Sequence, residues 1–473
     1  MVHNGDPVPR GRVRRTMPLA GFTARAAGGR LVAGLREKTG DAGAVERFHQ
    51  RTAERYTELL GHSKGVLMKA GQLFSMVDAM AVGYSELSPY QAALTRLQAD
   101  APPMEPALAR EVLHGDLGRP AHEVFAEFTD EPMAAASIGQ VHRAVLHDGR
   151  QVAVKIQYPG AAEAIRADLA NTELLATFFR FASSASGSGM QADLRQMTRE
   201  ISARIAEEID YRHEAANITM FSDLYHGHPF IRVPHVVYEA SGDRVLTMTY
   251  LDGINWAAAQ QVDQKLKNTW AEVIWRFATG AYRHGNLFNA DPHPGNYRFG
   301  MDGKVGFVDF GCVKVLPENR RRQTVGMVRA TIEGRKPDLH NLMFESGFLP
   351  DDSTVTLDEV YQWWAEQLYE LLAPQPVTYT QDAAARAIRG LIDVRSPDSA
   401  VRRMSVPDDF VFMSRIDLSL NTICAALGAS VHVRAMVDDM DGVAEPITPL
   451  GEQHDAWVRR RGLPHGLEPH DHP

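Results

Sequence analysis

The sequence is short of cysteine, of long apolar runs and of net positive charge. Its two cysteines, Cys312 and Cys424, offer no disulfide framework in 473 residues, which favours a reducing, intracellular setting. It contains no run of about 18 apolar residues, the length that crosses a bilayer. Arg25, Arg30 and Arg36 interrupt any secretory signal. The net charge of −9 argues against nucleic acid as a partner. We therefore expect a cytoplasmic protein without a transmembrane helix.

The N-terminal segment is basic, in contrast to the whole chain. Residues 1–38 carry eight Lys or Arg side chains and two acidic ones. Two interpretations follow. The segment is a solvated, flexible tail, or it is a basic amphipathic segment that rests on anionic lipid and holds the protein peripherally on a membrane.

The order of periodic segments predicts an α+β chain in which a strand-rich lobe precedes a helix-rich lobe. Residues 42–80 have helical spacing, whereas residues 141–146 and 151–156 alternate as strands around an Asp148-Gly149 turn. Residues 160–225 return to helical spacing, and residues 231–251 favour two more strands. The expected parts are these: 1–40, a basic flexible segment; 41–104, a helical extension; 105–251, a small β-rich lobe with inserted helices; 252–445, a helical lobe; and 446–473, a flexible tail. This is the order of a bilobal protein-kinase-like fold.

The segments Asp291-Pro292-His293-Pro294-Gly295-Asn296 and Asp309-Phe310-Gly311 carry the strongest chemical signal. In protein kinases a catalytic Asp orients the nucleophile, an Asn five residues later binds magnesium, and the Asp of Asp-Phe-Gly binds it again. Asp291 and Asn296 have that spacing, and a hairpin predicted over residues 296–308 leads to Asp309. Because phosphoryl transfer needs mainly positioning and charge neutralisation, this arrangement predicts a site for ATP or ADP and Mg²⁺.

Lys155, on the strand Val152-Ala153-Val154-Lys155, resembles the lysine that contacts nucleotide phosphates. The loop before it takes the place of a glycine-rich phosphate loop, yet only Gly139 is a glycine there. Three alanines replace the others, so we expect a stiffer loop and an altered nucleotide affinity or preference. The predicted nucleotide-binding residues are Ala134, Ala135, Ala136, Ser137, Ile138, Gly139, Lys155 and, at the adenine hinge, Met248, Thr249, Tyr250 and Leu251.

Glu214 is the candidate carboxylate partner of Lys155. It follows the lysine by 59 residues, which implies helices inserted within the small lobe. The alternative for Glu214 is a surface carboxylate on a charged helix. With Lys155 and Asp291 it completes the predicted catalytic set.

The alanine loop and the Asp291–Asn296 segment together resemble the UbiB/AarF/ADCK family of atypical kinases. Two further motifs support the resemblance over roughly residues 45–440: Lys69-Ala70-Gly71-Gln72 and Glu208-Ile209-Asp210. The resemblance implies that the helical extension packs over the active site and that Lys69 pairs with Glu208 there. It also implies a role in the biosynthesis of isoprenoid quinones.

Several positions depart from ordinary protein kinases. Asn289 stands where the catalytic loop has a His, His293 replaces the transfer lysine, and no Ala-Pro-Glu segment follows Asp309. We therefore expect an ATPase or a small-molecule or lipid kinase that supports synthesis of a ubiquinone- or menaquinone-type molecule. Its expected partners are a nucleotide, anionic lipid or quinone precursors, and quinone-biosynthesis proteins. The alternatives are a nucleotide-sensing scaffold at the membrane and a protein kinase.

Overall fold

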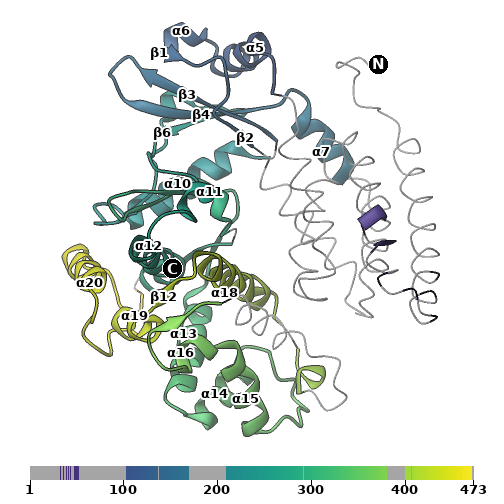
Figure 1. Cartoon of the computed structure of the whole chain (residues 1–473), viewed down its shortest axis with the longest axis vertical. Coiled ribbons are helices and arrows are strands. Elements are labelled where there is room, and N and C mark those ends of the chain that lie inside the picture. Colours follow the sequence, from purple (N-terminus) through teal and green to yellow (C-terminus); the bar gives the residue numbers. More distant parts are fainter. Residues whose placement is uncertain are drawn as a thin grey trace. The chain divides into compact units, whose positions relative to one another are not determined.

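The computed structural model describes residues 103–136, 138–169, 209–290, 292–380, 400–405 and 407–470, with isolated positions between 32 and 52. Among the predicted site and family-motif residues, six lie outside these ranges: Lys69, Gly71, Gln72, Ser137, Glu208 and Asp291. The chain divides into two compact units (Figure 1). The first comprises Met1–His213 and Val236–Tyr250, and the second Glu214–His235 and Leu251–Pro473.

An antiparallel sheet in the order β1-β3-β4-β6, with β2 added to β3, forms the centre of the first unit. The predicted hairpin is confirmed, because β3 and β4 pair from Gly139–Gln157 to Val145–Gln151. Gly149 takes a φ of +88° in the turn between them, which only glycine adopts without strain. The elements of this unit are α5 (Pro106–Leu117), α6 (Ala121–Val124), β1 (Phe125–Phe128), β2 (Ala134–Ala136), β3 (Gly139–Leu146), β4 (Gln151–Gln157), α7 (Ala161–Leu169), η1 (Tyr238–Ala240) and β6 (Val245–Thr249).

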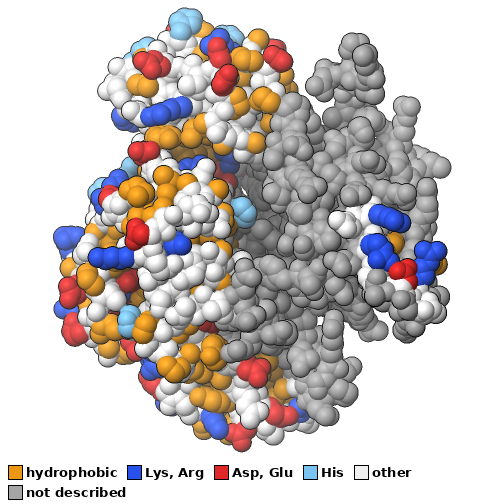
Figure 2. Space-filling model, viewed as in Figure 1, with side chains coloured by type: hydrophobic (Ala, Val, Ile, Leu, Met, Phe, Trp, Pro, Cys, Tyr) orange, Lys and Arg blue, Asp and Glu red, His pale blue; other side chains and the backbone are white. Residues whose placement is uncertain are grey.

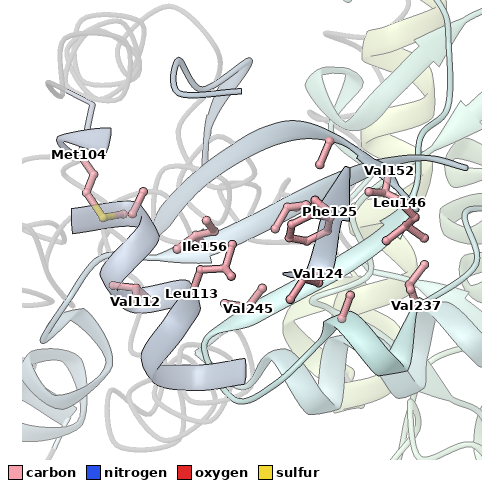
Figure 3. Close-up of a cluster of buried hydrophobic side chains, with 14 residues drawn as sticks. Met104, Val112, Leu113, Val124, Phe125, Leu146, Val152, Ile156, Val237 and Val245 are labelled. Carbon is pink, nitrogen blue, oxygen red and sulfur yellow. The ribbon is translucent and has the colours of Figure 1, made fainter. Parts of the chain in front are cut away.

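Helix α5 covers one face of this sheet and contacts β4 and β6. It starts at Pro106, where the missing N–H is harmless, and stops at Gly118 in the left-handed region. Val112 and Leu113 point from α5 toward Ile156 on β4 and Val245 on β6 (Figure 3). This apolar packing fixes the strand that carries Lys155.

The second unit is mainly helical and is organised around α12 (Gln264–Gly285), which is buried from Trp270 to His284. Arg276 on α12 is fully buried and makes two 2.8 Å bonds to Asp439 on α19. Its other elements are α10 (Tyr211–Leu224), which starts in the first unit, β5 (Ile231–Arg232), α11 (Trp256–Ala259), β7 (Leu287–Asn289), η2 (Pro294–Asn296), β8 (Tyr297–Phe299), β9 (Val305–Phe307), β10 (Val313–Val315), α13 (Glu318–Ile332), α14 (Lys336–Glu345), α15 (Leu357–Gln367), α16 (Tyr369–Leu372), β11 (Val377–Thr378), η3 (Ala400–Arg403), α18 (Asp408–Leu427), β12 (Ser430–Val431), α19 (Val433–Met440) and α20 (Pro449–Arg461).

The expectation of a flexible tail from residue 446 is wrong as far as residue 470. Helix α20 forms there, with the Thr448 hydroxyl accepting the Gly451 N–H at its start and Gly462 ending it. Trp457 is 1 % exposed and stacks on Tyr225, with ring centroids 5.7 Å apart. A Pro-, Gly- and His-rich composition suggests disorder, but these tertiary contacts order the segment.

The surface of the described residues mixes both signs of charge. On the face shown in Figure 2, Lys and Arg side chains are interspersed with Asp and Glu. Within the described part of the chain, no helix is both long and apolar enough to cross a membrane.

A buried carboxyl group on α16 is a point of pH sensitivity in the second unit. Glu370 is 6 % exposed, and burial raises its pKa to about 7. Burial and the charge of Glu370 raise the pKa of Asp417 on α18 to about 7 as well. Because the folded-state pKa of Glu370 lies above its unfolded value, it favours folding only while protonated, and this contribution is lost as pH rises through 7.

We predict that Glu370→Gln raises the free energy of unfolding at pH 8, because it removes the cost of ionising a buried carboxyl. The expected gain is on the order of 1–3 kcal/mol and shrinks steadily as pH falls from 7 toward 4.5. Urea denaturation of both proteins across this range measures it. The exposed Glu366→Gln is the matched control and should change stability by less than about 0.5 kcal/mol. A gain that is the same at every pH would contradict the assignment.

Candidate functional site

Lys155 lies in the middle of the sheet of the first unit. It is 9 % exposed and pairs with Val141 on β3 and Leu246 on β6. Its ammonium stands 5.2 Å from the centre of the Tyr211 ring, a distance at which the ring face attracts a cation. Two neighbouring strands therefore fix the backbone of Lys155 in the sheet.

The alanine loop begins as a strand. Ala134 to Ala136 form β2 and pair with β3, with Ala136 opposite Gly139. At Gly139 an added Cβ would stand 2.1 Å from the carbonyl oxygen of Ile156, so the approach of β3 to β4 requires glycine. Ile138 is buried and its carbonyl accepts the Tyr158 N–H at 2.9 Å. The loop is thus tied to the end of the strand that carries Lys155, and the stiffness expected for it stays a prediction.

The predicted hinge follows β6. Met248 is 5 % exposed and pairs with Ala153 on β4, two residues before Lys155. The Tyr250 N–H donates to the Gln151 carbonyl at 2.9 Å, so this amide is used within the sheet. Its ring lies 4.6 Å below the guanidinium of Arg143. Recognition of adenine by the backbone at Thr249 and Leu251 stays a prediction.

Asp210 of the Glu-x-Asp motif begins α10. Its carboxylate accepts the N–H groups of Arg212 and His213 at 3.0 and 3.1 Å, which satisfies two donors of the first turn. Glu214 follows in that turn and is 2 % exposed. The surface interpretation of Glu214 is therefore wrong. A buried carboxylate needs a partner, and its pairing with Lys155 stays a prediction because the two residues belong to different units.

A short ladder between β7 and β10 holds the Asp-Phe-Gly segment in the second unit. Leu287, Phe288 and Asn289 pair with Val315, Lys314 and Val313. The Asn289 amide also donates to the Asp309 carbonyl at 2.9 Å. Asn289 stands where kinases have a His, and its side chain fixes the backbone beside Asp309. The sequence marked this position as a departure but did not reveal this role.

Asn296 ends a turn that leads into β8. The Gly295 N–H donates to Nδ1 of His293 at 3.1 Å, and the Asn296 N–H donates to the His293 carbonyl at 2.9 Å. The Asn296 carbonyl accepts the Val308 N–H at 3.0 Å, directly beyond the β8–β9 ladder. Since Asp309 follows Val308, the ladder brings the backbones of Asn296 and Asp309 to one edge. The predicted hairpin is confirmed.

Helix α10 contains two contributors that sequence reasoning missed. The Asn217 amide donates to the Phe310 carbonyl at 2.8 Å, and Phe221 packs on the Phe310 ring at 4.9 Å between centroids. Phe310 is fully buried. Asn217 follows Glu214 by three residues and so lies on the same helix face. Only the spacing of Glu214, Asn217 and Phe221 along one face could have suggested this contact.

The donor set at this edge suits magnesium. Asp309 supplies a carboxylate, whose Oδ1 accepts the Gly311 N–H at 3.0 Å, and Asn296 supplies an amide oxygen. Mg²⁺ prefers oxygen ligands and usually takes few of them from protein, with substrate phosphates and water completing the shell. Among the described residues there is no cluster of three or more His, Cys, Asp or Glu side chains that could hold a metal ion alone.

Comparison with known proteins shows which family the chain resembles. Residues 96–343 match the ABC1 atypical kinase-like domain. The chain is 28 % identical over 469 residues to the atypical kinase COQ8B of Rattus norvegicus mitochondria, which covers 97 % of this chain and 83 % of the relative. It is 29 % identical over 394 residues to the mitochondrial atypical kinase COQ8 of Saccharomyces cerevisiae, which covers 80 % and 74 %.

A solved structure is also similar. The Rv3197–erythromycin complex of Mycobacterium tuberculosis superposes with a TM-score of 0.61 at 32 % identity, over 85 % of this chain and 98 % of that one. This likeness confirms the kinase-like α+β fold. Against three longer cyanobacterial and chloroplast relatives, the chain spans only 36 %, 54 % and 48 % of the relative's length.

We predict that Gly139→Ala destabilises the first unit, because its Cβ would collide with backbone at Ile156 rather than with a movable side chain. The free energy of unfolding should fall by about 1–3 kcal/mol, measured by urea denaturation. Gly115→Ala is the control, since its Cβ on α5 would be 3.4 Å from a flexible Arg244 guanidinium. That helical substitution should be neutral or stabilising, and an equal loss in both variants would refute the steric explanation.

Proposed function

The chain belongs to the ABC1 atypical kinase-like family, and from that premise we propose that it is a phosphoryl-transfer enzyme that uses ATP and magnesium. It hydrolyses ATP or transfers phosphate to a small molecule or lipid, in support of isoprenoid quinone biosynthesis. The observation that carries the proposal is the 3.0 Å bond from the Val308 N–H to the Asn296 carbonyl. This bond joins the two segments that carry the predicted magnesium ligands, Asn296 and Asp309.

Each predicted residue has one role in this proposal. Lys155, held by Glu214, contacts the nucleotide phosphates, and Asn296 and Asp309 hold the magnesium that neutralises them. Asp291 orients the nucleophile. Positioning and charge neutralisation supply most of the rate enhancement in such reactions, so no covalent intermediate on the protein is required.

Lys69 of the helical extension is proposed to pair with Glu208 of the inserted helices and so to cover the site. Such a cover would exclude a protein substrate while admitting a small molecule. It favours an acceptor that is a lipid, a quinone precursor or water over a protein side chain.

The short segment after Asp-Phe-Gly supports the same class of acceptor. Gly311 is followed by β10 and Pro317, and α13 begins at Glu318. Protein kinases place an activation loop and an Ala-Pro-Glu segment here to receive a peptide. The six residues between Gly311 and Glu318 are too few for that loop, which weighs against the protein-kinase alternative.

We predict that Asp309→Asn abolishes magnesium-dependent ATP turnover, because the amide removes the charge that binds magnesium. The expected loss in ADP release is on the order of 100-fold or more. The exposed Asp352→Asn serves as control and should keep wild-type turnover. Wild-type turnover in Asp309→Asn would sink the assignment.

Paired binding and turnover assays separate the enzyme from the nucleotide-sensing scaffold. Melting with ATP or ADP and magnesium reports binding, and ADP release reports turnover. Both are run with and without anionic liposomes and phenolic quinone precursors, since lipid is a proposed partner. A melting shift with no turnover under any of these conditions would favour the scaffold.

Macrolide binding is a second candidate, because the chain matches 98 % of a protein solved with erythromycin at 32 % identity. We predict that erythromycin raises the melting temperature, with a stabilisation of about 2.7 kcal/mol at a concentration 100 times its Kd. Melting curves across a concentration series measure this, with an unrelated compound of similar size as control. A melting temperature that does not change with erythromycin concentration up to the solubility limit would rule out macrolide binding.

A further inference from the structure

Helix α20 and the residues after it lie beyond the segment that matches the kinase-like family, which ends at residue 343. They are nevertheless docked on the second unit. The Trp457 indole N–H donates to the His226 carbonyl at 3.0 Å, and the Arg461 guanidinium donates to the Asp223 carbonyl at 2.7 Å. We call residues 463–470, which follow α20, the C-terminal strap.

Three buried histidines join α20 and the strap to the core. Nδ1 of His228 accepts two backbone N–H groups, so its Nε2 carries the proton and donates to Nδ1 of His454 at 3.0 Å. Nε2 of His454 then donates to Nε2 of His284 at 3.0 Å. Nδ1 of His284 donates to the Pro464 carbonyl at 2.8 Å. This single assignment of tautomers satisfies every ring nitrogen with neutral histidines.

Burial supports the neutral state of these rings. It lowers the pKa of His284 to about 3 and holds the pKa values of His228 and His454 well below their usual range. The nearby charges of Arg276 act in the same direction on His228 and His454. The hydrogen bond to the Pro464 carbonyl is therefore donated by the neutral ring of His284.

The strap then crosses the start of α13. Arg321, which is fully buried, donates to the carbonyls of Gly466 and Glu468 and forms an ion pair with Glu318 at 2.6 Å. This bond with Arg321 lowers the pKa of Glu318 to about 2. The His470 N–H donates to the Glu318 carboxylate at 3.2 Å. Gly466 has no room for a side chain, because a Cβ would stand 2.4 Å from Oδ1 of Asp441.

The strap also contacts the end of α12. Nε2 of His470 donates to the Arg283 carbonyl at 2.9 Å. Arg283 precedes β7 by four residues, and Glu318 follows β10 by three. Asn286 links the end of α12 to the start of α13. Its backbone carbonyl accepts the Leu316 N–H at 2.7 Å, and its side-chain amide donates to the Glu318 carboxylate at 3.3 Å. The strap thus touches both chain segments at the open end of the β7–β10 ladder.

We propose that the C-terminal strap is a positioning element for the active site: it clamps the end of α12 to the start of α13 and so holds the β7–β10 ladder, from which the Asn289 amide binds the Asp309 carbonyl. The proposal rests on the proposed function for its effect on turnover, but its structural part is independent of it. The strap would act through the ladder, since the hydrogen bonds described for it go to Asn286's neighbours on α12 and α13 and not to Asn296 or Asp309.

The test uses the full chain with His470→Ala, which removes the bond to Arg283, and Gly466→Ala, which forces the strap away from Asp441. Hydrogen exchange of peptides covering residues 286–290 and 312–316 is measured by mass spectrometry. We expect exchange of the Ala290 and Leu316 amides to accelerate about five- to tenfold, since each variant removes about one hydrogen bond's worth of stabilisation. ADP release should lose a similar factor in kcat with an unchanged KM for ATP.

Two further variants sharpen the test. His470→Gln retains a side-chain N–H that can reach the Arg283 carbonyl and should restore slow exchange and turnover. Arg460→Ala, exposed on α20, is the control and should behave as wild type. Where Gly466→Ala fails to fold, the comparison of His470→Ala with His470→Gln decides.

Each result has a defined meaning. If folded His470→Ala and Gly466→Ala proteins exchange both peptides at the wild-type rate, the strap does not hold the ladder and the proposal is wrong. Faster exchange in the variants, together with no ATP turnover even in the wild type, would support the structural role of the strap and contradict the proposed enzymatic activity. Faster exchange with unchanged kcat would overturn the link from the strap to the site.

Discussion

The β7–β10 ladder is the constraint on which the candidate site in the second unit depends. It is only three residue pairs long, yet it joins the end of the buried helix α12 to the start of α13. At one end Asn289 holds the Asp309 carbonyl, and at the other Asn286 receives the Leu316 N–H. Because so short a ladder has little stability of its own, side chains must reinforce it at both ends, and they do.

Helix α10 supplies a second constraint from a distant part of the chain. Asn217 and Phe221 fix the carbonyl and the ring of Phe310, the residue next to Asp309. Glu214 lies on the same face of α10, in its first turn. A displacement of α10 would therefore move the carboxylate proposed to hold Lys155 and the segment proposed to bind magnesium together. In the proposed function this helix would therefore serve two motifs that are separate in the sequence.

Local patterns predicted the parts of the fold that local physics decides. The β3–β4 hairpin followed from alternation around Asp148-Gly149, and the β8–β9 hairpin is the one predicted over residues 296–308. Strand 231–232 proved to be two residues long and pairs with β9 rather than with the sheet of the first unit. The roles of Asn217 and Asn289 depend on partners 93 and 20 residues away. Helical spacing could at most place Asn217 on the same face as Glu214, and it could not name the partner of either residue. The order after residue 446 was missed for the same reason.

The class of phosphate acceptor proposed above rests on how the chain continues after Asp309. In a protein kinase, a long segment after Asp-Phe-Gly forms the surface on which a peptide lies. Here the chain enters β10 two residues after Gly311, and the ladder holds it against β7. If this segment were loosened to receive a peptide, the β7–β10 pairing that fixes Asp309 would break. Peptide binding would then compete with the proposed magnesium binding. An acceptor that leaves the ladder intact, such as a small molecule, a lipid headgroup or water, is compatible with both.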